Sequence, residues 1–175
     1  MKKGKIALIG FRATGKSLVG KILAMKTHWP LVDMDKELIA SLGQDIDSYV
    51  RTYGWESFRE AESKLLHALA ERERLVVSTG GGVIERTVNR EKLKEQFFVV
   101  WLRASPETIH ARLLQDPETG ANRPPLTHLP MENEIEEVLR RRAPLYEEIA
   151  DLILDTDDAS PEELVSRIIL SAASS

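Results

Sequence analysis

Eight residues near the N-terminus constrain the fold of this chain more than any other feature. Residues 10–17 have the sequence GFRATGKS and match the pattern G-x-x-x-x-G-K-[ST]. A short apolar run at residues 6–9 precedes them, and apolar side chains at helical spacing follow in residues 16–25. A strand, a glycine-rich turn and a helix in this order predict a loop that wraps the phosphates of a nucleoside triphosphate.

The chemistry of phosphate binding explains the parts of this pattern. Glycines let the backbone turn tightly and bring its N–H groups to the phosphate oxygens, and the helix adds the positive end of its dipole. The Lys16 ammonium can reach the β- and γ-phosphates, and the Ser17 hydroxyl can ligate Mg²⁺. The residues expected to contact ATP in this loop are Ala13, Thr14, Gly15, Lys16, Ser17 and Leu18. The loop alone does not identify a reaction, because motors, switches and kinases share it.

The rest of the chain alternates between short apolar runs and segments with helical spacing. The further predicted strands are residues 31–32, 75–78, 97–102 and 152–154. The predicted helical segments are residues 36–74, with breaks at Gly43 and Gly54, then one from Ser105, one at about 132–150 and one from Ser160. Strands that alternate with helices predict an α/β fold, with a parallel sheet covered on both faces.

Residues 115–130 interrupt the alternation. They contain four prolines and a glycine but few large apolar side chains, which is typical of a surface loop. No internal repeat or linker divides the chain, so we expect a single domain spanning residues 1–175.

Composition excludes several other classes of protein. The net charge of −4 disfavours a general nucleic-acid binder, which is more often basic. The absence of cysteine excludes disulfides and thiolate metal sites. No run approaches the roughly 18 apolar residues of a membrane span. We therefore expect a cytoplasmic protein with no membrane or nucleic-acid partner.

Two acidic residues follow the second predicted strand. Strand alternation would place Asp33 and Asp35 on the same side, at the carboxyl edge of the sheet where ligands bind in α/β proteins. One carboxylate could hold the water shell of Mg²⁺, and the other could orient or deprotonate a substrate hydroxyl. The alternative is that both acids favour the N-terminus of a helix through capping and dipole effects.

Three arginines are candidates for binding an anion. Arg59 shares a helix face with Glu62, and the alternative there is a surface ion pair. Arg142 ends a run of three arginines, of which the first two are expected on the solvated face of a helix. Arg123 lies in the 115–130 loop, where it could neutralise a transferring phosphoryl group or simply serve solubility.

Three consecutive glycines follow the third predicted strand directly. Gly80, Gly81 and Gly82 increase the conformational entropy lost on folding, so a close approach of another group to the backbone is the expected reason for them. That approach could involve a ligand at the sheet edge, and the alternative is a tight turn from strand to helix.

Taken together, these residues resemble the shikimate kinases, a family of P-loop enzymes similar to nucleoside monophosphate kinases. The resemblance extends from Ile6 to about Ile169. The motifs that carry it, in order, are the loop 10–17, Asp33-x-Asp35, Phe58-Arg59-x-x-Glu62, Gly80-Gly81-Gly82, Arg123-Pro124, Arg142-x-x-Leu145-Tyr146 and Asp155-Thr156-Asp157 before Ser160-Pro161. The chain departs from the family pattern at Ala13-Thr14, where Gly-Ala or Gly-Ser is common, and at Pro125, where leucine is usual.

The resemblance implies a reaction and a fold. ATP would phosphorylate the 3-hydroxyl of shikimate, giving shikimate 3-phosphate and ADP on the route to chorismate and the aromatic amino acids. The implied fold is a five-stranded parallel sheet in the order 2-3-1-4-5, with a lid at about 115–130 and a substrate-binding helical region at about 36–72. The expected state is a monomer.

The resemblance also implies the role of each site residue. Asp35 would hold the reacting hydroxyl and act as the base, while Lys16 and Arg123 would stabilise the transferring phosphoryl group. The implied shikimate-binding groups are Asp35, Arg59, Arg142 and the backbone of Gly81. Ser17 and, through water, Asp33 would hold Mg²⁺. Arg112 and the segment 155–161 would border the adenine of ATP.

Other functions remain open on the sequence. A related kinase could act on gluconate or another hydroxy acid, although two arginines and an acid suit a hydroxylated carboxylate such as shikimate. A nucleotide-binding switch without catalysis would not need Asp35, Lys16 and Arg123 together. A nucleoside monophosphate kinase would need a set of base-recognition residues, which the sequence does not show.

Overall fold

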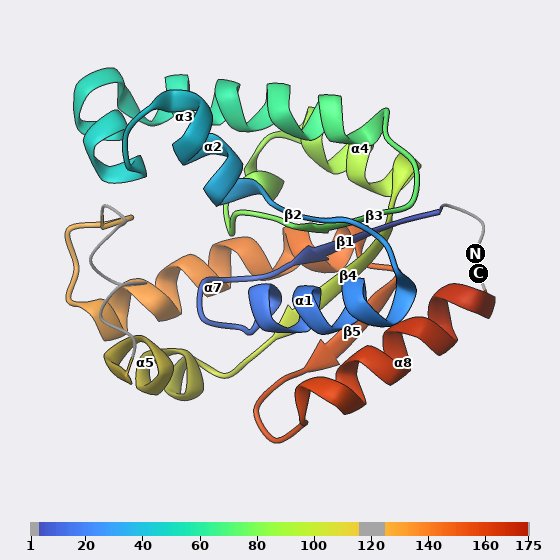
Figure 1. The fold of residues 1–175 in the computed structure, drawn as a ribbon. Helices are drawn as coiled ribbons and strands as arrows, with labels where there is room; N and C mark the ends of the chain where they lie inside the picture. The colour runs from blue at the N-terminus through green and yellow to red at the C-terminus, as the bar shows by residue number, and fades with distance from the viewer. Residues whose placement is uncertain (1–3, 116–124, 175) are drawn as a thin grey trace.

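A computed structural model describes residues 4–115 and 125–174 (Figure 1). Five parallel strands form one sheet in the order β2-β3-β1-β4-β5, which confirms the predicted order. The central strand β1 places Ala7 opposite Val77 of β3 and opposite Val99 of β4. The strands are β1 (Lys5–Ile9), β2 (Leu31–Asp33), β3 (Leu75–Ser78), β4 (Phe98–Arg103) and β5 (Leu152–Asp155).

The two faces of the sheet have separate cores because side chains alternate along each strand. Ile6 and Leu8 of β1 pack with apolar residues of α1 (Lys16–Thr27) and α8 (Pro161–Ser174). Ala7 and Ile9 pack on the opposite face with α3 (Ile46–Ala70), α4 (Thr87–Gln96) and α7 (Met131–Ile149). Figure 1 shows the resulting three layers, with the sheet between the two groups of helices.

The region between β2 and β3 forms a smaller helical unit. Its helices are α2 (Met34–Leu42) and α3, and both predicted glycine breaks are confirmed. Gly43 ends α2 with φ 70°, and Gly54 interrupts α3 with φ 82° and ψ 163°. Leu38 and Phe58 contribute to a separate apolar cluster there, so this unit has a small core of its own at the edge of the main one.

The segment after β3 differs from the sequence-based prediction. A short 3₁₀ helix, η1 (Val83–Glu85), and then α4 follow the glycine run. The sequence pattern did not predict α4, because only Asn89 and Leu93 of this helix are buried and the hydrophobic periodicity is weak. The helix predicted from Ser105 is confirmed as α5 (Pro106–Gln115).

Part of the predicted lid lies outside the described residues, including Arg123. Residues 125–130 form neither helix nor strand, and α7 begins directly after them. None of the described helices is long and apolar enough to cross a membrane.

Candidate active site

The phosphate loop connects β1 to α1 with the backbone conformation that its glycines allow. A Cβ atom on Gly10 would lie 2.3 Å from the carbonyl oxygen of Leu102, so only glycine fits beside β4 at this point. Gly15 caps α1 in a left-handed conformation with φ 91°. Leu18 lies in the first turn of α1, and its side chain is about half exposed.

The two unusual residues of the loop have distinct environments. Ala13 has φ 61°, a conformation that costs a residue with a side chain about 1–2 kcal/mol relative to glycine. Arg112 of α5 donates from Nη1 to the Ala13 carbonyl at 3.2 Å and from Nη2 to the Thr156 carbonyl at 2.6 Å. The Thr14 side chain is buried, and its hydroxyl donates to the Phe11 carbonyl at 2.8 Å. Arg112 therefore ties the loop to the segment that follows β5.

Lys16 and Ser17 begin α1 with their polar groups directed to different neighbours. The Lys16 ammonium donates to the carbonyl oxygens of Gly10 at 2.9 Å and Phe11 at 2.6 Å, so it lies over the loop backbone. The Ser17 hydroxyl donates to Oδ2 of Asp33 at 3.1 Å. The Ser17 hydroxyl at the start of α1 and the Asp33 carboxylate at the end of β2 thus converge beside the loop, and oxygen ligands are what Mg²⁺ prefers.

The structure corrects the prediction that Asp33 and Asp35 share one side of a strand. β2 ends at Asp33, whose carboxylate caps α2 by accepting from the Lys36 N–H at 3.4 Å. Asp35 consequently lies in the first turn of α2, and not on the strand. A Cβ atom on Gly80 would lie 3.0 Å from Oδ1 of Asp35, which places this carboxylate against the end of β3. Asp33 therefore caps a helix, as the alternative interpretation predicted, and it also contacts Ser17, the other candidate Mg²⁺ ligand.

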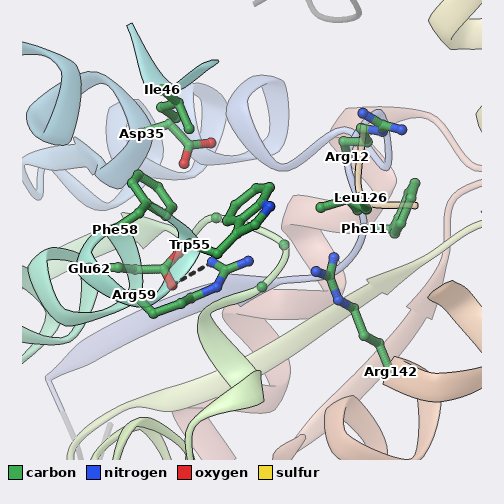
Figure 2. Close-up of a pocket in the computed structure, with 13 residues that line it drawn as sticks. Phe11, Arg12, Asp35, Ile46, Trp55, Phe58, Arg59, Glu62, Leu126 and Arg142 are labelled. Atoms are coloured by element: carbon green, nitrogen blue, oxygen red, sulfur yellow. Dashed lines mark hydrogen bonds and ion pairs between the residues drawn. The ribbon is translucent and has the colours of Figure 1, made fainter. Parts of the chain in front are cut away.

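A pocket of about 460 Å³, part of it open to solvent, lies beside the loop. The residues that line it are Phe11, Arg12, Asp35, Ile46, Trp55, Phe58, Arg59, Glu62, Gly80, Gly81, Gly82, Leu126 and Arg142. Figure 2 shows Asp35, Ile46 and Phe58 on one side, with Phe11, Arg12 and Leu126 on the other. The pocket thus brings together residues from the phosphate loop, the small helical unit, the glycine run and α7.

Arg59 and Glu62 form a buried ion pair, so the surface-pair alternative is wrong. Arg59 Nη1 donates to Glu62 Oε2 at 2.7 Å, and the two residues are 9% and 1% exposed. Burial raises the pKa of Glu62 above its ordinary value, although Arg59 acts in the opposite direction. The Arg59 guanidinium also lies 5.1 Å from the ring centroid of Trp55. Its position is therefore constrained by both a carboxylate and an aromatic face.

Arg142 is buried, and the exposure predicted for its two arginine neighbours is confirmed. Its Nε and Nη2 both donate to Oε1 of Glu85, at 2.9 Å and 2.7 Å. A Cβ atom on Gly81 would lie 3.6 Å from Nη1 of Arg142, so the remaining nitrogen faces the glycine run. Figure 2 shows the guanidinium directed into the pocket.

The glycine run is explained by close approach, as predicted, but the approaching groups are protein side chains. A Cβ atom on Gly82 would lie 2.0 Å from Nη2 of Arg59, and one on Gly80 would lie 2.7 Å from Oε1 of Glu62. The Tyr146 hydroxyl donates to the Gly81 carbonyl at 2.5 Å, and burial raises the pKa of Tyr146 to about 12. A side chain at Gly80 or Gly82 would therefore displace Glu62 or Arg59, which line the pocket.

Several pocket residues were not singled out by the sequence. Arg12 occupies a variable position of the loop pattern, and Trp55 and Ile46 have no motif of their own. Glu85, which contacts both Arg59 and Arg142, also lacks a sequence signal, because these contacts form only when distant segments meet.

Comparisons with known proteins agree with this geometry. The model of the family described as "Shikimate kinase" matches residues 12–173. The chain belongs to the shikimate kinase family. The shikimate kinase of Nitratidesulfovibrio vulgaris is 42% identical over 153 residues, which cover 87% of each chain. A solved structure of the shikimate kinase from Acinetobacter baumannii in complex with shikimate has a TM-score of 0.90 and 32% identity, and covers 98% of this chain and 93% of the other.

Membership of the shikimate kinase family makes this chain a kinase. Of the residues predicted for this family's substrate, the pocket brings together Asp35, Arg59, Gly81 and Arg142. Lys16, Ser17 and Asp33 lie at the adjoining phosphate loop and strand end. Arg112 lies apart from the pocket, between the loop and Thr156, and Arg123 lies outside the described residues.

Proposed function

We infer that this chain transfers the γ-phosphoryl group of ATP to the 3-hydroxyl of shikimate, giving shikimate 3-phosphate and ADP. This reaction is a step of chorismate and aromatic amino acid biosynthesis. One observation carries the inference: a single pocket beside a phosphate loop is lined by a carboxylate, Asp35, and two buried guanidinium groups, Arg59 and Arg142.

The two arginines suit the carboxylate of the substrate. A guanidinium group binds a planar carboxylate through parallel N–H donors, and burial strengthens such contacts. The nitrogens nearest the glycine run are Nη2 of Arg59 and Nη1 of Arg142. The backbone of Gly81 lies close to Arg142 and would contact the same substrate. The apolar rings of Trp55 and Phe58 would pack against the carbon skeleton.

Asp35 is proposed as the group that holds the reacting hydroxyl. As the hydroxyl oxygen bonds to the γ-phosphorus, the bond from that phosphorus to the β–γ bridging oxygen breaks and ADP leaves. Asp35 accepts the hydroxyl proton in the same process. Lys16 and Arg123 are proposed to stabilise the negative charge of the transferring phosphoryl group.

The residues present also fit Mg²⁺. Ser17 and Asp33 place two oxygen atoms 3.1 Å apart beside the phosphate loop. Among the described residues no group of three or more acidic or histidine side chains forms a metal cage, and Mg²⁺ in kinases commonly uses only one or two protein groups besides phosphates and water. When bound, the ion would neutralise charge on the phosphates, with Ser17 a direct ligand and Asp33 acting through water.

The remaining proposed contacts to ATP involve the phosphate loop and the segment that follows β5. The phosphates of ATP would lie against Ala13, Thr14, Gly15 and Leu18 at the start of α1. Arg112 and the segment 155–161 would border the adenine, and the support for this is the fixed position of Arg112 against Thr156.

We further propose that the chain functions as a cytoplasmic monomer that needs neither nucleic acid nor membrane. The net charge of −4 supports the absence of a nucleic-acid partner. Size-exclusion chromatography with light scattering tests the oligomeric state, and a dimer mass at assay concentrations would contradict it.

A coupled assay of ADP release with and without shikimate tests the function. We expect ADP release to require both Mg²⁺ and shikimate, with one shikimate 3-phosphate formed per ADP. Gluconate and other hydroxy acids are the comparison substrates. Turnover of one of these without turnover of shikimate would contradict the assignment, and ATP binding without any turnover would favour a nucleotide-dependent switch.

A further inference from the structure

Glu85 occupies a central position among the basic residues of the site. It is the last residue of η1, three residues beyond the glycine run. Oε1 accepts from Nε and Nη2 of Arg142 at 2.9 Å and 2.7 Å, and Arg141 Nη2 lies 3.3 Å from the same oxygen. Oε2 lies 3.4 Å from Nε of Arg59. One carboxylate thus connects guanidinium groups from two different helices, α3 and α7.

The pattern of contacts leaves one nitrogen of each guanidinium closest to the pocket. Arg142 uses its Nε and Nη2 for Glu85, and Nη1 faces Gly81. Arg59 uses Nη1 for Glu62 and directs Nε toward Glu85, while Nη2 lies against Gly82. Figure 2 shows both guanidinium groups directed toward the pocket. Glu85 therefore determines which atoms of each arginine are available to a ligand.

The electrostatics of the site favour an ionised Glu85. Two buried cations that face one pocket repel each other, and a carboxylate between them offsets this repulsion. Burial by itself raises the pKa of Glu85, but Arg142, Arg59 and Arg141 outweigh it and hold the pKa below its ordinary value. Glu62 accepts its hydrogen bond from Arg59, whereas Nε and Nη2 of Arg142 both donate to Glu85.

We propose that Glu85 is a positioning residue that sets the spacing and orientation of Arg59 and Arg142 for binding the substrate carboxylate. The proposal rests on the proposed function and deepens it. Glu85 acts through the two arginines and does not contact the reacting hydroxyl or phosphoryl group. It should therefore affect capture of the acceptor substrate far more than the rate of phosphoryl transfer.

Steady-state kinetics of Glu85→Gln test this role. Glutamine has the same size but no charge, and its single carbonyl oxygen cannot bridge both arginines. We expect the shikimate KM to rise about tenfold, which corresponds to about 1.4 kcal/mol, while kcat and the ATP KM stay within about twofold. The matched control is Glu137→Gln, which removes a charge from an exposed position of α7 and should leave all three constants unchanged.

Two further variants separate positioning from a general structural role. Glu85→Asp keeps the charge, so its shikimate KM should lie between those of the wild type and Glu85→Gln. In an Arg142→Ala background, Glu85→Gln should raise the KM less than twofold further, because residues that act through one another are not additive. If Glu85 had a purely structural role, Glu85→Gln would lower kcat or the unfolding temperature. That loss would also be seen in the Arg142→Ala background.

The possible results lead to different conclusions. An unchanged or lowered shikimate KM in folded Glu85→Gln overturns the positioning role, and a lowered KM would mean that Glu85 competes with the substrate for the arginines. If circular dichroism shows that Glu85→Gln is unfolded, Glu85→Asp replaces it in the test. An unchanged or lowered shikimate KM in Glu85→Asp then overturns the positioning role. A wild-type chain that does not phosphorylate shikimate refutes the proposed function itself, and the role of Glu85 falls with it.

Discussion

Arg12 of the phosphate loop forms an ion pair with Glu134 of α7, with 2.6 Å between Nη2 and Oε1. The other oxygen of Glu134 accepts from the Thr127 N–H at 2.8 Å and from the Thr127 hydroxyl at 3.2 Å. A buried carboxylate therefore joins the loop that would bind ATP to the segment that precedes α7. Arg12 also lines the pocket, so this contact extends from the pocket into the protein interior.

Glu134→Gln should destabilise the protein by about 3 kcal/mol, because it removes the carboxylate charge that faces the largely buried Arg12 guanidinium. For a chain of this length, that loss corresponds to an unfolding temperature about 6–12 °C lower. Differential scanning calorimetry measures the shift. Glu136→Gln, at an exposed position of the same helix, should change the unfolding temperature by less than about 2 °C. Equal shifts for both variants would contradict the importance of the Arg12 contact.

Asp35→Asn should lower kcat about 10²- to 10⁴-fold, since an amide cannot accept the hydroxyl proton. Its ATP Kd should stay within about twofold, because Asp35 belongs to α2 and not to the phosphate loop. Calorimetric titration with an ATP analogue and the coupled assay measure the two quantities separately. Near-normal turnover would remove Asp35 as the base.

Arg59→Ala should raise the shikimate KM and also destabilise the protein. The substitution removes the partner of Glu62, which is 1% exposed, and an unpaired buried acid costs about 3–5 kcal/mol. The double variant Arg59→Ala with Glu62→Gln should therefore recover part of the stability but none of the affinity for shikimate. Chemical denaturation and the coupled assay provide the two measurements. A KM equal to that of the wild type would leave Arg59 with a structural role only.

The stabilising effect of Glu85 should depend on pH. Because its pKa is lower in the folded protein than the ordinary 4.5, the folded state favours the ionised form. The contribution is therefore present above the unfolded pKa and is lost as the pH falls through the folded pKa. We expect the difference in unfolding free energy between wild type and Glu85→Gln to be largest near neutral pH and to shrink below pH 4.5. Denaturant melts across this range measure it, and a difference that grows on acidification would contradict the assignment.

The sequence determined the features that depend on neighbouring residues. The phosphate loop consists of eight consecutive residues that join a strand to the start of a helix, so its motif predicts both its position and its chemistry. The apolar runs predicted all five strands, and Gly43 and Gly54 predicted the helix breaks, because each requires only local backbone conformation. The strand order and the substrate, in contrast, were predicted from the resemblance to a family, because hydrophobic periodicity contains no information about either.

Only the tertiary structure decided how the acids and arginines of the site are paired. Alternation misplaced Asp35 because Asp33 caps α2, which begins at Met34, two residues before the predicted start, and replaces the strand geometry with that of a helix. The alternative of a surface ion pair for Arg59 and Glu62 was wrong, because both residues are buried and pack closely against Gly82 and Gly80. Glu85 and Arg142 are 57 residues apart, and their contact exists only once η1 and α7 pack together. Such long-range contacts depend on the whole folded chain, and for that reason no local pattern in the sequence predicts them.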